Sequence, residues 1–199
     1  MMMKKILVLM SLVGVMGSCD VAQQLAGTYS LTQCKYDYNS ISGLTLGGVN
    51  LQDVSSLSSL NPLAAANLLA AFSSPKGNLP MQFTLNLDVT NPGYQTALLN
   101  GLQYILEIDG IEMTTGGVDS KLQIATGQKA QLPITLGFDL KKVMSGQSAE
   151  AIKNLAFNFA GIGSNASKVT FKLKPTLLIG NQTLNSPSYI PVSFTLGGK

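Results

Sequence analysis

Carboxylate groups are the side chains of this sequence whose types and spacing could do chemistry. The chain contains no histidine and no arginine, which removes the commonest general base, the commonest zinc ligand and the guanidinium clamps that hold phosphates. Glu107, Asp109 and Glu112 cluster around one predicted turn. Paired acids can bind Ca²⁺ or hydrolyse glycosides, so a carboxylate-based glycan-active enzyme is one hypothesis. A solvated hairpin tip explains the cluster more simply, and we therefore predict no enzyme activity, no cofactor, no metal and no catalytic residue.

Cys19 is the residue whose covalent chemistry the sequence predicts most clearly. Lys4 and Lys5 precede an apolar run from Ile6 to Val15. This run is shorter than the roughly 20 residues that span a bilayer and is typical of a secretory signal peptide. It ends in Met16-Gly17-Ser18-Cys19, which resembles a bacterial lipobox. The resemblance implies lipid transfer to the thiol and cleavage before Cys19.

These features predict an address for the protein. We expect residues 1–18 to be a signal peptide and residues 19–27 to be the lipidated N-terminus and a spacer. Stable attachment needs at least two acyl chains, which a diacylated or triacylated Cys19 supplies. The protein is then anchored by lipid in the bacterial cell envelope. We expect the outer membrane, but Asp20 after the cysteine resembles an inner-membrane retention signal in some bacteria, and the choice of membrane and of its periplasmic or surface side stays open. Because Cys19 is acylated, Cys34 lacks a disulfide partner within the chain and is expected to be a small buried hydrophobe.

The charge balance excludes nucleic acid as a partner. All basic residues are lysines, and removal of the two in the signal peptide leaves a mature balance of 11 − 10 = +1. Nucleic-acid binding needs concentrated positive charge, which this chain does not have. The partners left open are the membrane, through the N-terminal lipid, and an envelope protein or an apolar ligand.

Alternation of apolar and polar residues predicts a mainly β structure. Regular alternation marks strands over residues 81–89, 130–138, 169–173 and 190–196, and weaker strands are expected at Tyr29–Leu31 and Leu44–Leu46. Pro133 removes a backbone donor, so its strand should lie at an edge or contain a bulge. Asp109-Gly110 separates two apolar-rich runs and predicts a type I′ hairpin turn.

Two segments have helix signals. Asn61-Pro62 provides an N-cap and a first-turn proline for a helix over Leu63–Phe72 that is apolar on nearly every side. Such a helix should be buried or should line an apolar site. Ser148 caps a second helix, whose apolar positions are Ile152, Leu155, Ala156 and Phe159, with Gly161 as its stop.

Many short strands with few helices favour an antiparallel β-sandwich. We predict an immunoglobulin or fibronectin-III-like shape with about seven or eight strands and two short helices. The length fits one domain over residues 28–199. Within it, residues 28–78 are expected to be an N-terminal elaboration and residues 79–196 the core.

One stretch of the core resembles a known family. A strand ends in Asn91-Pro92, Tyr104 lies in the next strand, Asp109-Gly110 forms the turn, and Pro133 stands in a strand with the sequence Leu-Pro-Ile. This order, over residues 79–140, is similar to the type-2 late-embryogenesis-abundant (LEA) family, also called the water-stress and hypersensitive-response (WHy) domain. The resemblance implies a small immunoglobulin-like sandwich in which these motif residues are structural. Family members are linked with stress protection, and some relatives hold apolar molecules.

Two function classes therefore lead. The first is a non-catalytic, membrane-anchored envelope lipoprotein with a structural or stress-protective role. The second is a module that binds a lipid or another apolar ligand, suggested by the apolar helix over Leu63–Phe72.

Overall fold

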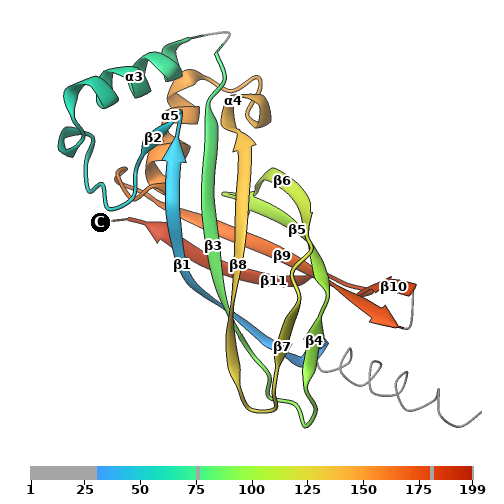
Figure 1. Cartoon of the computed structure of the whole chain (residues 1–199). Helices are drawn as coiled ribbons and strands as arrows, with labels where there is room; N and C mark the ends of the chain where they lie inside the picture. Colours follow the sequence, from blue (N-terminus) through green and yellow to red (C-terminus); the bar gives the residue numbers. More distant parts are fainter. Residues whose placement is uncertain (1–30, 75–76, 180–181, 199) are drawn as a thin grey trace, which may run out of the picture.

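Two antiparallel β-sheets pack face to face and form most of this molecule (Figure 1). The structure is a computed structural model, and it describes residues 31–74, 77–179 and 182–198. The first sheet has the order β2-β1-β3-β8, built from Val49–Asn50, Lys35–Leu46, Pro80–Thr90 and Lys129–Asp139. The second has the order β10-β9-β5-β6, built from Gln182–Asn185, Ala166–Ile179, Gly101–Ile108 and Ile111–Val118, and β11 (Ile190–Gly197) also pairs with β9. A small third sheet joins β4 (Ala97–Leu99) to β7 (Leu122–Ile124). The mainly β sandwich predicted from the sequence is confirmed.

The core lies between the inner faces of the two sheets. Alternate residues of β3 point inward, and these side chains are at most 2% exposed: Met81, Phe83, Leu85, Leu87 and Val89. From the other sheet, Val169, Phe171 and Leu173 of β9 are equally buried. Each such side chain contributes roughly 1.5–3 kcal/mol when it leaves water, which explains why the period-two pattern predicts these strands so well.

Pro133 lies on an edge strand, as predicted. The strand β8 pairs with β3 along its whole length and ends the order of its sheet. Pro133 is opposite Asn86 in this ladder and is exposed. An edge position suits a residue without a backbone N–H, because a missing donor removes no ladder bond on the solvent side.

The hairpin turn between β5 and β6 is also confirmed. Asp109 has φ 51° and Gly110 has φ 81°, so both central residues take the left-handed conformation that a type I′ turn requires. Asparagine, aspartate and glycine adopt it at the lowest cost, which is why the dipeptide is such a clear signal.

The two predicted helices lie at one end of the sandwich, together with a shorter helix that the sequence does not predict (Figure 1). Helix α3 spans Pro62–Ser73, and the Asn61 side chain accepts a hydrogen bond from the Ala64 N–H. Helix α5 spans Ala149–Phe159, with Ser148 as its N-cap. The short α4 (Leu140–Val143) and the 3₁₀ turn η1 (Leu57–Ser59) have too few residues to show a helical period.

The N-terminal part of the described chain is more regular than its sequence suggests. Strand β1 pairs with β3 and so forms part of the sandwich itself. Its register shifts between Tyr38 and Ser40 and again between Ser42 and Thr45, and each shift breaks the alternation that would reveal a long strand. The weaker strand expected at Leu44–Leu46 falls inside β1, whereas Leu31 is helical, as are the two residues after it, and does not lie in a strand.

The predicted signal peptide and spacer lie outside the described residues. Within residues 31–74, 77–179 and 182–198, no helix is long and apolar enough to cross a membrane.

Candidate functional site

Two of the three hairpin carboxylates, Glu107 and Asp109, form structural contacts in this fold. Asp109 accepts hydrogen bonds from the Lys168 N–H at 2.8 Å and from the Ser167 hydroxyl at 3.1 Å, and these contacts tie the turn to β9. Glu107 forms an ion pair with Lys172. Glu107 and Glu112 are cross-strand partners, but Asp109 leaves the strand because of its left-handed backbone. Among the described residues, no group of three or more histidine, cysteine or acidic side chains could hold a metal ion.

Asn91 is a buried polar residue whose side chain forms several hydrogen bonds. It lies at the opposite end of the sandwich from the helices. Its side chain is fully buried. The side-chain amide donates to the Gln95 carbonyl at 2.7 Å and to the Ile124 carbonyl at 2.9 Å, while its oxygen accepts from the Gly93 N–H at 3.0 Å. These bonds join the loop after β3 to the strand β7. Pro92 follows, exposed, where β3 has ended.

Tyr104 fills the space left by a glycine. Its side chain is 9% exposed, and its ring stacks on Phe171 with centroids 5.3 Å apart. A Cβ added at Gly116 would lie 2.5 Å from the Tyr104 hydroxyl oxygen, so the ring needs a residue without a side chain beside it. Burial raises the pKa of Tyr104, which keeps the hydroxyl protonated.

Cys34 is buried and is a free thiol. Burial raises the pKa of this thiol to about 11. A cysteine acts as a nucleophile through its thiolate, so the environment of Cys34 holds it in the unreactive form. The expectation of a small buried hydrophobe agrees with this position.

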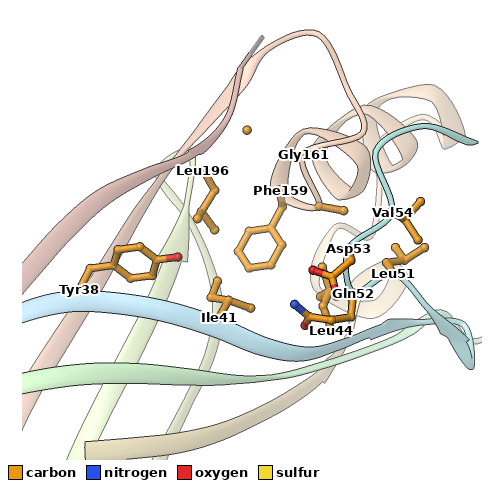
Figure 2. Close-up of a pocket in the computed structure, with 12 residues that line it drawn as sticks. Tyr38, Ile41, Leu44, Leu51, Gln52, Asp53, Val54, Phe159, Gly161 and Leu196 are labelled. Atoms are coloured by element: carbon orange, nitrogen blue, oxygen red, sulfur yellow. The ribbon is translucent and has the colours of Figure 1, made fainter. Parts of the chain in front are cut away.

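A groove lies between β1, the first strand of the chain, and β11, the last strand. Strands β1 and β11 are held together by Tyr38 and Phe194, whose rings stack with centroids 4.0 Å apart. Beyond this pair lies a pocket of about 260 Å³. Figure 2 shows the Phe159 ring in this pocket, above Ile41 and between Leu196 and Asp53. The groove thus combines side chains from β1, the loop after β2, the end of α5, and β11.

The lining of this groove is mixed, because polar atoms contribute at least as much of its exposed surface as apolar atoms do. Most of its side chains are aliphatic or aromatic, and its polar side chains are Gln52 and Asp53 together with the Tyr38 hydroxyl. Burial raises the pKa of Tyr38, so this group is a neutral hydrogen-bond partner. Pockets for small molecules typically measure about 300–1,000 Å³. At about 260 Å³ this groove falls below that range, so its volume limits an occupant to a short acyl segment or a small ring.

Sequence reasoning missed the groove because its walls come from segments far apart in the chain. Leu44 and Leu196 belong to the alternating patterns of strands, and Phe159 belongs to the apolar face of a helix. These patterns predict the strand or helix but give no sign of the groove. The apolar helix α3 contributes no residue to this pocket.

The helix α3 differs from its prediction. Leu68 and Phe72 pack into the core, whereas Leu63 is 71% and Leu69 is 41% exposed. The expectation that this helix is buried or lines an apolar site is therefore only partly met, because α3 rests on the sandwich along one narrow stripe.

Comparisons with known proteins give distant structural similarities only. No model of a protein family matches this chain, and no curated protein matches it. It is similar to the crystal structure of a protein from Archaeoglobus fulgidus, at 13% identity and TM-score 0.39, covering 82% of this chain and 98% of that one. It is similar to a solution structure from Arabidopsis thaliana, at 10% identity and TM-score 0.39, with coverages of 83% and 80%.

A further similar solution structure is of a proposed LEA protein, at 10% identity and TM-score 0.41, covering 96% of this chain and 88% of that one. The motifs of residues 79–140 resemble a family of the same name.

Proposed function

We propose that this chain is a non-catalytic lipoprotein of the bacterial cell envelope. It is anchored through Cys19, and its β-sandwich lies outside the bilayer. The observation that carries the proposal is the order of segments at the N-terminus: two lysines, a short apolar run and Met16-Gly17-Ser18-Cys19. Residues 19–27 are the expected lipidated N-terminus and spacer, and they would tether the domain to the membrane. An anchor of two or more acyl chains on such a tether holds a folded domain stably at a bilayer.

The absence of a catalytic role is supported by how the structure employs its acidic side chains. Glu107 and Asp109, the candidates for acid catalysis, both have structural partners in β9. A general acid or base must reach a bound substrate. Carboxylates that fix a hairpin to its neighbouring strand are better placed to stabilise the fold.

Two cysteine variants test the anchor, one of them a matched control. Cys19→Ala should yield an unprocessed or soluble protein, because the thiol that receives the lipid is gone. Cys34→Ala also removes one thiol but should keep the lipid modification and the membrane fraction of the wild type. The measurements are intact mass of the mature protein and fractionation of inner from outer membranes. The proposal is wrong if Cys19→Ala is processed and fractionated like the wild type.

A structural or stress-protective role completes the proposal. A strain that lacks this protein should lose viability after drying or osmotic shock, and the full-length gene should restore it. Complementation with Cys19→Ala should fail if protection requires the protein at the membrane. Equal survival of the deletion and the parent strain would argue against protection and leave a structural role.

A second candidate function, binding of an apolar ligand, is favoured by the groove around Phe159. Native mass spectrometry of the protein from its own host should then show a copurifying lipid. Leu196→Trp should fill the groove and abolish uptake of a fluorescent fatty acid. Thr195→Trp is the matched control, since adjacent residues of a strand point to opposite faces. Finding neither a copurifying lipid nor any uptake by the wild type would exclude this function.

A further inference from the structure

The end of the sandwich at which the described chain begins carries a fully exposed aromatic side chain. Tyr94 is 99% exposed and lies in the loop between β3 and β4. This loop follows Thr90, whose partner in the neighbouring strand is Lys35, the first residue of β1. The described chain begins only a few residues earlier, at Leu31. The Tyr94 loop and the start of the domain therefore lie at the same end.

The Tyr94 loop is held in place from inside. The Asn91 side chain binds the backbone on both sides of Tyr94, at Gly93 and at Gln95. A third bond from the same side chain reaches Ile124. A tyrosine on a loop fixed in this way is presented to the solvent without losing the conformational entropy that a mobile loop would lose on binding.

The surface around Tyr94 is uncharged. Residues 91–100 and 122–128, which form the loops and short strands at this end, contain no acidic or basic side chain. The nearest lysines in the register, Lys35 and Lys129, are paired with acids, to Asp37 at 3.3 Å and to Asp88 at 3.1 Å. The exposed Lys121 lies just outside this stretch. Tyrosine is enriched where proteins meet the polar region of a bilayer, so an uncharged loop that carries one tyrosine suits such a contact.

The point where the described chain begins decides which end of the domain is nearer to the proposed anchor. Leu31 is the twelfth residue after the proposed anchor, and a chain of that length spans at most about 40 Å when fully extended. Strand β1 has twelve residues and carries the chain about 40 Å away to Gly47, which adjoins Leu68 and Ala71 of α3. The proposed anchor is therefore joined to the domain at the Tyr94 end, and the helix end lies one strand length further along the chain.

From this geometry we propose that the Tyr94 loop is a docking surface for the bilayer to which the protein is anchored. This inference rests on the lipid anchor of the proposed function. Tyr94 enters the headgroup region, and the sandwich contacts the membrane through the loop between β3 and β4. The helix end, with the exposed Leu63, points away from the membrane. Because the tether keeps the loop close to the bilayer, even a weak single-residue contact is populated through its high effective concentration.

The chain offers a clean test because it contains no tryptophan. Tyr94→Trp and Leu63→Trp each introduce a single fluorophore at an exposed position, at the near and far ends respectively. Both variants are prepared as full-length lipidated protein in vesicles of phosphatidylethanolamine and phosphatidylglycerol. Vesicle flotation reports anchoring. Emission wavelength and quenching by lipids brominated in their acyl chains report contact with the bilayer.

The expected result is flotation of both variants, with a blue-shifted and quenched emission for Tyr94→Trp and an unshifted, unquenched emission for Leu63→Trp. Quenching of Leu63→Trp alone would overturn the inference and place the helix end on the membrane. Flotation without quenching of either variant would also overturn it, while leaving the anchor intact. Failure to float would refute the anchor and, with it, the docking surface.

Discussion

Replacement of the buried Asn91 side chain should destabilise the protein strongly. The residue is fully buried and forms side-chain hydrogen bonds of 2.7, 2.9 and 3.0 Å. Asn91→Ala leaves two backbone carbonyls and one backbone N–H without this partner. Each buried polar group that loses its partner costs about 1–3 kcal/mol, so the total is about 3 kcal/mol or more. That is a large share of the roughly 5–15 kcal/mol that stabilises a typical domain.

Thermal unfolding followed by circular dichroism measures this loss. For a domain of this size, 1 kcal/mol shifts Tm by roughly 2–4 °C, so Asn91→Ala should melt at least about 6 °C below the wild type. Asn67→Ala is the control, because Asn67 is exposed on α3 and should change Tm little. A melting temperature for Asn91→Ala within about 2 °C of the wild type would refute the role assigned to the network.

Asn91→Asp adds a test by pH. The new carboxyl would be buried and would face two carbonyl oxygens, so its folded pKa should rise above the unfolded value of about 3.9. An acid with a raised folded pKa loses stability as pH increases. The variant should therefore lie closest to the wild type below about pH 4 and fall further behind towards neutral pH. A difference in Tm that does not change with pH would contradict this account.

Three further predictions use the same melts or simple labelling. Gly116→Ala should cost about 1–3 kcal/mol, since the new methyl group meets a buried tyrosine ring, whereas Gly117→Ala should change stability by less than about 0.5 kcal/mol. Leu68→Ala should cost about 2–5 kcal/mol because its side chain is fully buried, and Leu63→Ala, at an exposed site, should be nearly neutral. The Cys34 thiol, with its pKa raised to about 11 from 9.0, should form about 100-fold less thiolate at pH 8 than in unfolded protein. Mass spectrometry of alkylation should then show correspondingly slower labelling until the protein is unfolded, and equal rates would show that the thiol is accessible.

Local signals in the sequence account for most of the secondary structure. The strand β3 and the helix α5 each repeat their apolar residues at the period of their element, and the turn at Asp109-Gly110 needs residues that tolerate a positive φ. These features depend on neighbours within a few positions, so one sequence is enough to predict them. The two shifts of register in β1 have no such signature, which explains why the sequence predicts that strand only in part.

The arrangement around Asn91 could be predicted only partly. The sequence indicates that an Asn-Pro pair ends a strand, because these residues favour turns and interrupt the ladder. It does not show that the same side chain binds Ile124, more than thirty residues away. Contacts over such separations depend on which strands pair, and strand pairing is decided by the packing of both sheets together.

The sequence by itself determined the mainly β class, the positions of the main helices and the hairpin turn, because each follows from the local period or from the conformational preference of one or two residues. Its N-terminal pattern also supports the proposed anchor at Cys19. Only the tertiary structure decided that α3 exposes part of its apolar surface, that β1 and β11 separate to form a groove, and that Tyr94 stands at the end where the described chain begins. Exposure and proximity belong to the whole fold, since they depend on which distant segments cover a side chain.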